Sequence, residues 1–530
     1  MTETVDVVII GAGFSGLYAT YRLSKQYKVI CFEKGAGVGG TWYWNRYPGA
    51  RVDIQSVEYS YSFDDDLQQD WKWPEYFSAQ PDLERYANHV ADRFNLREHI
   101  RLSNAVESLR FDAENDLWEV RTAAGDYVRC RYIIAATGAL SIPNEPPWPG
   151  REDYQGVIYH TTDWPREPMD LSDKRVGLIG TGSTGVQAAP ILAEQAKSLT
   201  VFQRTPAYSM PSGNRAMDEE HERDWKENYP ERRKEILNTW GTSMVTYGEK
   251  SAHECSEEER TQVLEKAWNS KSAFQMQVAF TDVMTDMDAN EVVAEFIRNK
   301  IRGIVDDPET AERLCPKTYP VGGKRMCIDN GYYQTFNRDN VSLVDVRSAP
   351  IVELTKTGLR TAEGEYDLDV IVMATGFDAV TGSLMNMDVE GIDGIKLAEK
   401  WKEGPTTYLG YMIAGFPNLL MVHGPMTPGA QAQMITSGEW QVDYLAELID
   451  SMEADGKTRV DTTEEAEQWW YEETQNVAMH MVHRHADSWY NAKNIEGKKG
   501  DFMIYVGGFP RFTELSRKAA ENDWEGFDLR

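Results

Sequence analysis

The stretch VDVVIIGAGFSGLYATYRLSKQYKVICFE, residues 5–33, decides the fold class. It contains a short apolar strand, a glycine-rich turn, a helical segment and a second apolar strand that ends at Glu33. Glycines in such a turn let the backbone approach a pyrophosphate at the helix N-terminus, and the acid accepts hydrogen bonds from a ribose hydroxyl. We therefore predict a β-α-β unit that binds a dinucleotide. Its predicted contacts are Gly11, Gly13, Ser15, Gly16 and Glu33.

The pattern returns at residues 175–204, where RVGLIG leads into GTGSTG, a helical segment and the strand LTVFQR. This second strand is followed by Arg204 and Thr205 instead of an acid. A carboxylate would repel a 2′-phosphate, whereas an arginine binds it through charge-assisted hydrogen bonds. We predict NADPH at this unit, and a surface arginine in a degenerate unit is the alternative. The predicted contacts in the turn and helix are Gly180, Thr181, Gly182, Ser183, Thr184, Gly185 and Gln187.

Two further segments, IIAATGAL at 133–140 and VIVMATGFD at 370–378, place a turn of small residues after an apolar strand. Paired turns of this kind beside two glycine fingerprints are similar to flavoproteins with two dinucleotide-binding domains. In that architecture FAD occupies the first site and the nicotinamide cofactor the second. We predict an α/β fold with two Rossmann-like domains.

The remaining chain suggests how these domains are divided. SIPNEPPWPG, residues 141–150, is too rich in proline for regular structure and indicates a connector. Residues 212–321 are highly charged and predict helices with solvated faces. Residues 331–345 and 368–378 are expected to return to the sheets as strand and turn. We predict an FAD-binding domain of residues 1–141 and 377–530, an NADP-binding domain of 142–211 and 322–376, and a helical insertion of 212–321.

Composition excludes several classes of function. The chain has 530 residues, 41% hydrophobic and 26% charged, and a formal charge of −30. This charge argues against nucleic acid and anionic membranes as partners. No apolar run approaches the ~20 residues of a membrane span, and the early glycine motif leaves no room for a signal peptide. The five cysteines are scattered without a C-x-x-C pair, which argues against a disulfide reductase and a metal cluster. We expect a cytoplasmic protein.

A resemblance to a named family begins at GGTWYWNRYPGARVD, residues 39–53. This segment matches in full the Trp-rich signature of type I Baeyer–Villiger monooxygenases, which are class B flavoprotein monooxygenases. YQGVIYHTTDWP, residues 154–165, resembles the second signature of the family, with Tyr154 in place of the usual Phe. The chain is similar to these enzymes over nearly its whole length.

The resemblance implies an activity. NADPH reduces FAD, O2 adds to give a C4a-peroxyflavin, and this species converts a ketone to an ester or lactone. In GGKRMC the resemblance assigns Arg325 as the catalytic arginine, paired with Asp53. A fixed guanidinium stabilises the peroxide anion and the developing alkoxide. Lys324 is implied as a second ligand of the 2′-phosphate.

Further site residues follow from the same resemblance. Trp489 is expected near the nicotinamide cofactor, although it is also one of 16 tryptophans that could pack a core. Met434 is expected to line the substrate pocket, and a surface loop is the alternative. His160 is either a general base or, as we favour, a linker residue whose hydrogen bonds couple domain motion to turnover. The implied cofactor contacts in and after the Trp-rich signature are Gly40, Thr41, Trp42, Trp44 and Tyr59.

Two other functions stay open from the residues alone. An N- or S-oxidising flavin monooxygenase would share both fingerprints. A flavin-binding sensor without catalysis would bind FAD but show no ketone-dependent NADPH turnover. The sequence does not identify the natural ketone, and we expect a monomer or a weak homo-oligomer.

Overall fold

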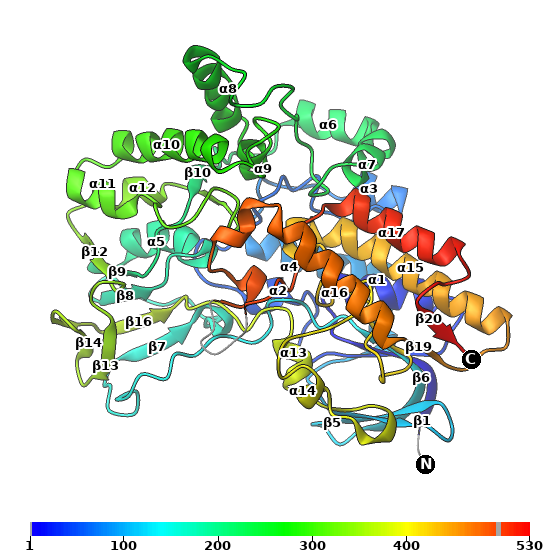
Figure 1. The fold of residues 1–530 in the computed structure, drawn as a ribbon. Coiled ribbons are helices and arrows are strands. Elements are labelled where there is room, and N and C mark those ends of the chain that lie inside the picture. The colour runs from blue at the N-terminus through cyan, green and yellow to red at the C-terminus, as the bar shows by residue number, and fades with distance from the viewer. Residues whose placement is uncertain (1–2, 494–499) are drawn as a thin grey trace.

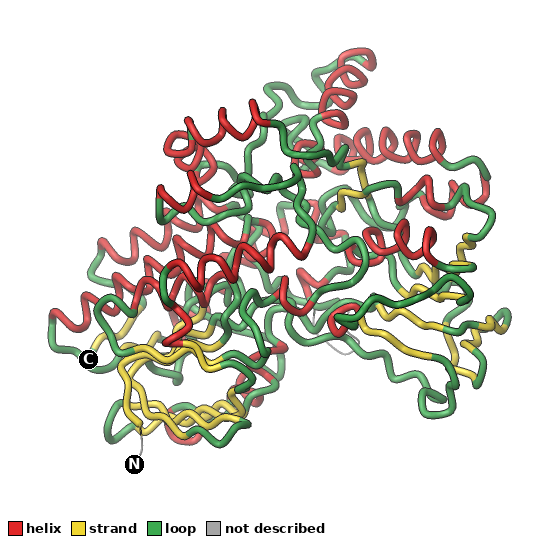
Figure 2. The backbone as a smooth tube through the Cα atoms, turned by 180° about the vertical axis from the view of Figure 1, so that it is seen from behind, coloured by secondary structure: helices red, strands yellow, loops and turns green. Residues whose placement is uncertain are grey.

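A computed structural model describes residues 3–493 and 500–530 of the chain. Two sheets lie side by side, each with helices packed on it, and a further group of helices lies across one end of both (Figure 1). The view from behind shows the same two groups of strands, well separated, with loops between them (Figure 2). The predicted α/β fold is confirmed.

The first sheet has eight strands in the order β17-β4-β5-β6-β1-β2-β3, and β18 pairs with β6 off this path. β1 runs parallel to β2 and β6, and α1 (Phe14–Leu23) connects β1 to β2, so the first β-α-β unit is confirmed. Its apolar strands are buried because helices and strands cover both faces. The strands are β1 Glu3–Ile10, β2 Val29–Phe32, β3 Ile100–Arg101, β4 Val106–Asp112, β5 Leu117–Thr122, β6 Tyr127–Ala135, β17 Asp388–Glu390 and β18 Leu419–Met421.

The second sheet has five strands in the order β12-β9-β8-β16-β7, and all of its neighbours run parallel. α5 (Ser183–Gln195) connects β8 to β9, which confirms the second β-α-β unit. All carboxyl ends of these strands therefore meet at one edge, where α/β sheets bind ligands. The strands are β7 Val157–His160, β8 Arg175–Ile179, β9 Ser198–Gln203, β12 Val341–Asp345 and β16 Val370–Met373.

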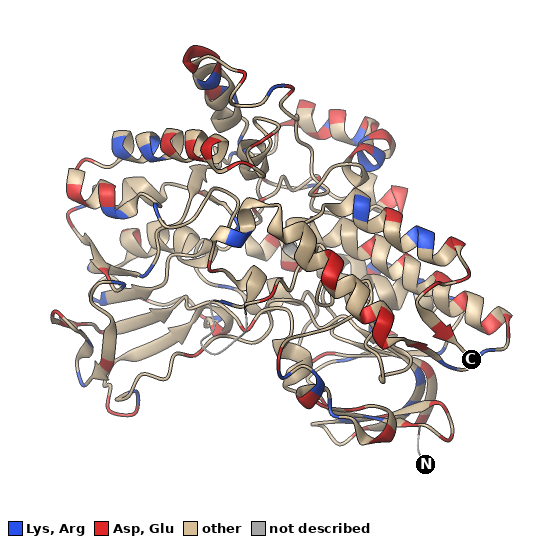
Figure 3. Cartoon of the chain, viewed as in Figure 1, with Lys and Arg blue, Asp and Glu red and all other residues tan. Residues whose placement is uncertain are grey.

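Residues 212–321 are helical, as predicted. Asp218, Ser256, Asp286 and Asp307 cap four of these helices through their side chains. Figure 3 shows acidic and basic residues on these helices, whereas the strands of both sheets are mostly uncharged. The helices are α6 Glu219–Glu227, α7 Tyr229–Leu237, α8 Glu257–Asn269, α9 Ala273–Gln277, α10 Met287–Ile304 and α11 Pro308–Leu314.

The C-terminal part of the chain returns to the first sheet. α15 (Met434–Ala454) packs against α1, where the Tyr18 hydroxyl donates to Asp443 at 3.0 Å. α16 (Glu464–Met479) and α17 (Phe509–Glu521) lie beside α15 (Figure 1). Together with β17 and β18, these helices give the first sheet partners from both ends of the chain.

One prediction for residues 331–345 is wrong. Only 341–345 form a strand, and residues 332–335 form the short helix α12 (Tyr332–Thr335). Asp329 accepts hydrogen bonds from the backbone N–H groups of Gly331 and Tyr332 at 2.9 and 3.0 Å. This side-chain turn starts a helix where the aromatic residues predicted a strand.

Shorter elements complete the chain. No helix within residues 3–493 and 500–530 has the length and apolar character to cross a membrane. Small sheets are formed by β10 Ser209–Pro211 with β11 Cys327–Asp329, by β13 Ile351–Thr355, β14 Gly358–Thr361 and β15 Glu365–Asp367, and by β19 Val460–Thr462 with β20 Phe527–Leu529. Other helices are α2 Thr41–Trp44, α3 Asp65–Asp70, α4 Gln80–Arg93, α13 Gly382–Met385 and α14 Leu397–Lys400. The 3-10 helices are η1 Leu96–His99, η2 Thr161–Asp163, η3 Ile392–Gly394, η4 Gly429–Gln431, η5 Val482–His485 and η6 Trp489–Asn491.

Candidate active site

Each glycine fingerprint packs against one of the two turns of small residues, at residues 136–138 and 374–376. Gly11 has φ +100°, and a Cβ there would lie 2.6 Å from the carbonyl oxygen of Ala136. Gly180 has φ +110°, and a Cβ there would lie 2.2 Å from the carbonyl oxygen of Ala374. Any other residue would be strained in both places. In both units, therefore, a glycine turn packs against a turn of small residues that is distant in sequence.

Glu33 stabilises the first glycine turn through hydrogen bonds to backbone N–H groups. Its carboxylate is 5% exposed and accepts hydrogen bonds from the N–H groups of Ala12 and Gly35, both at 2.7 Å. Burial raises the pKa of Glu33, although these hydrogen bonds oppose the shift. A carboxylate oxygen has further lone pairs, so Glu33 can still accept from a ribose hydroxyl.

The Trp-rich signature lies directly over this turn. A Cβ on Gly40 would lie 2.8 Å from the Cα of Gly13, so the two glycines are in close backbone contact. Thr41 begins α2, and the indole N–H of Trp42 donates to the Tyr59 hydroxyl at 3.1 Å. Burial raises the pKa of Tyr59 to about 12. The predicted FAD contacts from Gly40 to Tyr59 are thus grouped at the N-terminus of α1.

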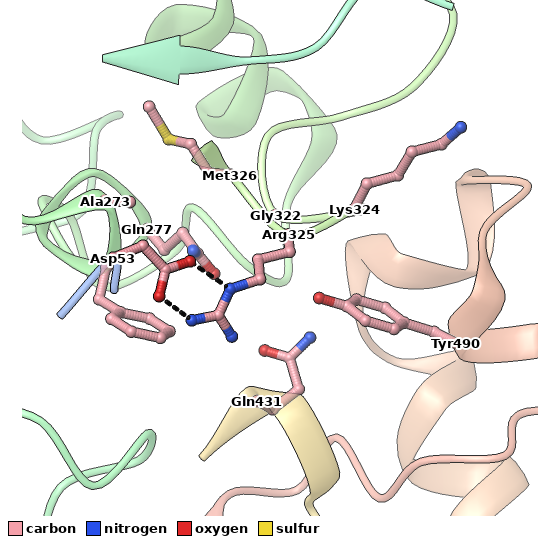
Figure 4. Close-up of a pocket in the computed structure, with 10 residues that line it drawn as sticks. Asp53, Ala273, Gln277, Gly322, Lys324, Arg325, Met326, Gln431 and Tyr490 are labelled. Carbon is pink, nitrogen blue, oxygen red and sulfur yellow. Dashed lines mark hydrogen bonds and ion pairs between the residues drawn. The ribbon is translucent and has the colours of Figure 1, made fainter. Parts of the chain in front are cut away.

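Arg325 and Asp53 form a bidentate ion pair (Figure 4). Arg325 Nε donates to Asp53 Oδ2 and Nη2 to Oδ1, both at 2.8 Å. The two side chains are 24% and 21% exposed. Burial alone would lower the pKa of Arg325, but Asp53 raises it above its ordinary value, so the guanidinium stays charged. The pairing that the family resemblance implies is present.

The pocket around this pair is built from distant parts of the chain. Phe274 and Gln277 come from the helical insertion, Gln431 from η4, and Tyr490 from η6. The Arg325 guanidinium lies 5.7 Å from the centre of the Phe274 ring. We did not predict these four residues. Tyr490 and Gln431 are close in sequence to the predicted Trp489 and Met434, but nothing in the sequence signals Phe274 or Gln277.

A group of cations lies at the carboxyl edge of the second sheet. Arg204 and Thr205 follow β9, and Lys324 precedes Arg325. Burial first, and then Arg204 and Arg347, lower the pKa of Lys324 to about 8, while Asp487 opposes the shift. Like charges held together in this way indicate an anion site.

Arg347 belongs to this group, and sequence reasoning missed it. Its Nη2 donates to the Thr205 hydroxyl at 3.3 Å across 142 residues of chain. The contact exists because β9 and β12 are parallel neighbours, with Gln203 opposite Asp345. Both strands end at one edge, so the turns that follow them meet.

Gln187, which we predict as a cofactor contact, also hydrogen-bonds the Trp-rich signature. Its side chain accepts from the Tyr47 hydroxyl at 2.9 Å and donates to the Arg51 carbonyl at 3.0 Å. A Cβ on Gly49 would lie 2.3 Å from the Gln187 carbonyl oxygen. The YPG part of the Trp-rich signature therefore joins the first unit to α5 of the second. Nearby, Ser183 contacts the Cys327 thiol at 3.2 Å, and the Thr181 hydroxyl donates to the Thr205 carbonyl at 2.7 Å.

The structure places the remaining predicted residues around this centre. Trp489 is half-buried and packs edge-on against Tyr490, with ring centres 4.6 Å apart. Met434 begins α15, and its carbonyl contacts His423 Nε2 at 3.0 Å. In the loop before α15, Gln431 rather than Met434 lines the pocket of Arg325.

The second signature holds the linker in place. His160 accepts a hydrogen bond from the Thr162 N–H at 3.3 Å, which caps η2, and burial lowers its pKa. This agrees better with a linker residue than with a general base. The Tyr154 hydroxyl donates a hydrogen bond to the Leu368 carbonyl at 3.0 Å. The structure therefore provides a partner for the extra hydroxyl that Tyr has compared with the usual Phe.

Comparison with known proteins gives consistent results. The family model described as pyridine nucleotide-disulphide oxidoreductase matches residues 8–322. All five cysteines are free and buried, and their positions in the sequence include no C-x-x-C pair. A Baeyer–Villiger monooxygenase of Pseudooceanicola batsensis is 40% identical, over 99% of this chain and 96% of its own. A phenazine N-monooxygenase of Lysobacter antibioticus is also 40% identical, over 99% of this chain and 97% of its own.

Solved structures show the same arrangement. The crystal structure of the OTEMO complex with FAD and NADP superposes with a TM-score of 0.96 at 38% identity, and the match covers 100% of both chains. Both glycine turns, the cation group and the Arg325 pair thus belong to a fold that is known to hold FAD and NADP together.

Proposed function

The chain belongs to the Baeyer–Villiger monooxygenase family, and from this premise we infer that it uses FAD and NADPH to insert one oxygen atom of O2 beside a ketone carbonyl. The product is an ester or, from a cyclic ketone, a lactone. The observation that carries this inference is the bidentate Arg325–Asp53 pair, which opens onto a pocket shared by both dinucleotide-binding units and the helical insertion.

We propose that Arg325 is the catalytic residue of this pocket. Its guanidinium is held in one orientation by two hydrogen bonds to Asp53, and it carries a permanent positive charge. Negative charge that develops on the ketone oxygen during oxygen insertion is stabilised by a cation that needs no reorganisation. Asp53 therefore acts as a positioning residue, because it fixes the plane of the guanidinium.

The first unit supplies the FAD site in this proposal. Gly11, Gly13 and Gly40 allow the close backbone packing that forms the turn at the N-terminus of α1, where a pyrophosphate would bind, and Glu33 would accept a hydrogen bond from the ribose. Trp42 and Tyr59, joined by a hydrogen bond, form a rigid wall next to it. Bound FAD, reduced by NADPH, supplies the activation of O2.

The second unit supplies the NADPH site. We propose that Arg204, Thr205, Lys324 and Arg347 hold the 2′-phosphate, which relieves the mutual repulsion of the three cations. Tyr490 lines the pocket of Arg325 and Trp489 packs against it, so we propose that these two rings border the nicotinamide. The three cations make this site locally positive, although the whole chain carries a formal charge of −30.

A second candidate is oxygenation of nitrogen. It is favoured by one observation, the phenazine N-monooxygenase that is 40% identical over 99% of the chain. Heteroatom oxygenation does not require charge stabilisation on a carbonyl oxygen, so it should depend less on Arg325.

The test is aerobic NADPH oxidation by the FAD-loaded protein with ketones, amines and sulfides, with products identified by mass spectrometry. Wild type is expected to form esters, and Arg325→Ala to lose ester formation by roughly 10²-fold or more. Arg338→Ala removes an exposed arginine and should match wild type. N- or S-oxides without ester would establish the second candidate, and no oxygenation of any compound would favour a flavin-binding sensor.

We further propose a cytoplasmic monomer or weak homo-oligomer, with the domain boundaries at residues 141, 211, 321 and 376. Five free cysteines support a reducing compartment. The return of residues 377–530 to the first sheet supports the division of the first domain into two segments.

A further inference from the structure

A large cavity lies in the helical insertion, outside the site described above. We call it the insertion chamber; it has a volume of about 390 Å³ and is lined by some of the residues of segments 240–248 and 274–285 and by Met481. Small-molecule pockets in proteins span ~300–1,000 Å³, so the insertion chamber is of ligand size.

The wall of the insertion chamber is uncharged. Among the described residues that line it, none is acidic, basic or a histidine. Its apolar wall consists of Trp240, Val245, Tyr247, Phe280, Met284 and Met481. A charged ligand buried against such a wall would lose its hydration without gaining a partner. The chemistry of the wall therefore selects an uncharged, apolar group.

The insertion chamber adjoins the pocket of Arg325. Phe274 and Gln277 line both cavities, so one face of each side chain borders the guanidinium pocket and the other the chamber. A Cβ on Gly322 would lie 2.6 Å from Met284 Cε, which shows how closely the chamber wall approaches the loop that carries Arg325. A ligand in the chamber is therefore separated from the guanidinium pocket only by these two side chains, and it reaches Arg325 when they turn aside.

We propose that the insertion chamber binds the apolar body of a large, uncharged ketone while its carbonyl lies at Arg325. This proposal rests on ketone oxygenation as the proposed function, and it names the substrate class. A cavity of ~150 Å³ holds one benzene ring, so a volume of about 390 Å³ accommodates two to three fused rings or a chain of similar bulk. Ketones with a charged arm are disfavoured by the same wall.

Tyr247 marks the entrance to the insertion chamber. It lines the cavity, yet it is 48% exposed, so the chamber opens to solvent beside it. Its hydroxyl accepts a hydrogen bond from the backbone N–H of Trp240 at 2.8 Å, which holds Tyr247 against the backbone of residue 240 at this opening. Substrate can thus enter the chamber through this opening in the insertion.

The first experiment compares kcat/KM for cyclohexanone and for a fused tricyclic ketone. Val278→Phe and Thr281→Phe each add a bulky ring to the wall of the insertion chamber. Each should lower kcat/KM for the tricyclic ketone roughly tenfold or more and change that for cyclohexanone less than about twofold. Val352→Phe, an equal increase at an exposed position on β13, should change neither.

The second experiment measures binding without turnover. Tricyclic ketone is titrated calorimetrically into FAD-loaded protein without NADPH or O2, for wild type and the same variants. We expect weaker binding in both filling variants and unchanged binding in Val352→Phe. Thr281 is exposed, so its variant should fold even if Val278→Phe does not.

Two outcomes separate the proposals. If esters are formed but both filling variants treat the two ketones alike, the insertion chamber is not a substrate site, and the proposed function stands. If no ketone is oxygenated, the proposed function fails, and the calorimetric comparison alone decides whether the chamber binds apolar ketones.

Discussion

At the scale of single residues, we expect Arg347 to decide how strongly the second unit distinguishes NADPH from NADH. It is exposed and contacts Thr205, at the edge where a 2′-phosphate is expected. We predict that Arg347→Ala raises KM for NADPH about three- to tenfold, because a charge-assisted hydrogen bond at the surface contributes ~1 kcal/mol. KM for NADH should not change, since NADH lacks the phosphate. Arg338→Ala is the matched control, and an equal rise for both cofactors would contradict the assignment.

We expect Lys324 to make cofactor binding depend on pH. Burial and the neighbouring arginines lower its pKa to about 8, so it loses its charge as the pH rises through that value. A bound phosphate stabilises the charged form, and binding should therefore weaken above about pH 8. We predict this loss for 2′,5′-ADP, measured by calorimetry between pH 6.5 and 9.5, but not for 5′-AMP.

Lys324→Arg supplies the control for this prediction. A guanidinium stays charged throughout the range, so the variant should bind 2′,5′-ADP equally well at both ends of it. If the variant loses affinity over the same interval as wild type, another group is responsible.

At the scale of elements, two glycines in the same turn have different roles. A Cβ on Gly180 would collide with the Ala374 carbonyl, whereas nothing in the chain lies within 4 Å of a Cβ on Gly182. Gly180→Ala should thus lower the free energy of unfolding by roughly 1–3 kcal/mol through strain at φ +110°. Gly182→Ala should leave it nearly unchanged but weaken NADPH binding, because the pyrophosphate has to pass over this backbone.

These two variants are compared by urea unfolding and by NADPH titration, with flavin absorbance as a check on the first unit. Both should retain FAD, since neither touches the first glycine turn. Gly303→Ala, in a helix with open space around it, controls for the added methyl group. Equal stability of Gly180→Ala and Gly182→Ala would refute the assigned packing role.

At the scale of the whole molecule, residues 57–63 fasten the helical insertion to the first unit. Glu58 accepts hydrogen bonds from the Ser243 hydroxyl and the Met244 N–H, both at 2.8 Å, and it precedes Tyr59. Arg233 of α7 donates to the Glu58 carbonyl at 2.9 Å. Ser243 also lines the insertion chamber, so the chamber wall and the flavin-side segment are held together through Glu58.

This fastening makes stability depend on pH. Burial raises the pKa of Glu58 to about 7, against an ordinary value of 4.5, although its two donors oppose the shift. The folded chain therefore keeps a proton that the unfolded chain has lost between these values. The contribution of Glu58 is full below about pH 4.5 and is lost as the pH rises through about 7.

We predict that Glu58→Gln is more stable than wild type at pH 7.5, by up to about 3 kcal/mol, and nearly equal to it at pH 5. The amide cannot ionise and still accepts both hydrogen bonds. Urea unfolding at the two pH values measures the difference. Glu227→Gln, at an exposed position on α6, should follow wild type, and parallel pH profiles for Glu58→Gln and wild type would rule out this account.

Local patterns in the sequence determined the two β-α-β units, the helical character of residues 212–321 and the preference for NADPH. Each depends on neighbouring residues, because strand and helix periodicity and the glycine turn are properties of short segments. The family signatures added Asp53 and Arg325, which the fold brings into one ion pair. The same local reasoning failed at residues 332–335, where the Asp329 side chain starts a helix.

Only the tertiary structure decided which distant side chains meet. Arg347 reaches Thr205 because β9 and β12 are neighbours, and strand order is not encoded in either strand alone. Gln187 contacts the Trp-rich signature, and Phe274, Gln431 and Tyr490 surround Arg325, because separate units pack against one another. The insertion chamber likewise exists only between packed segments. Such contacts depend on long-range packing, whereas sequence patterns report local backbone conformation and burial.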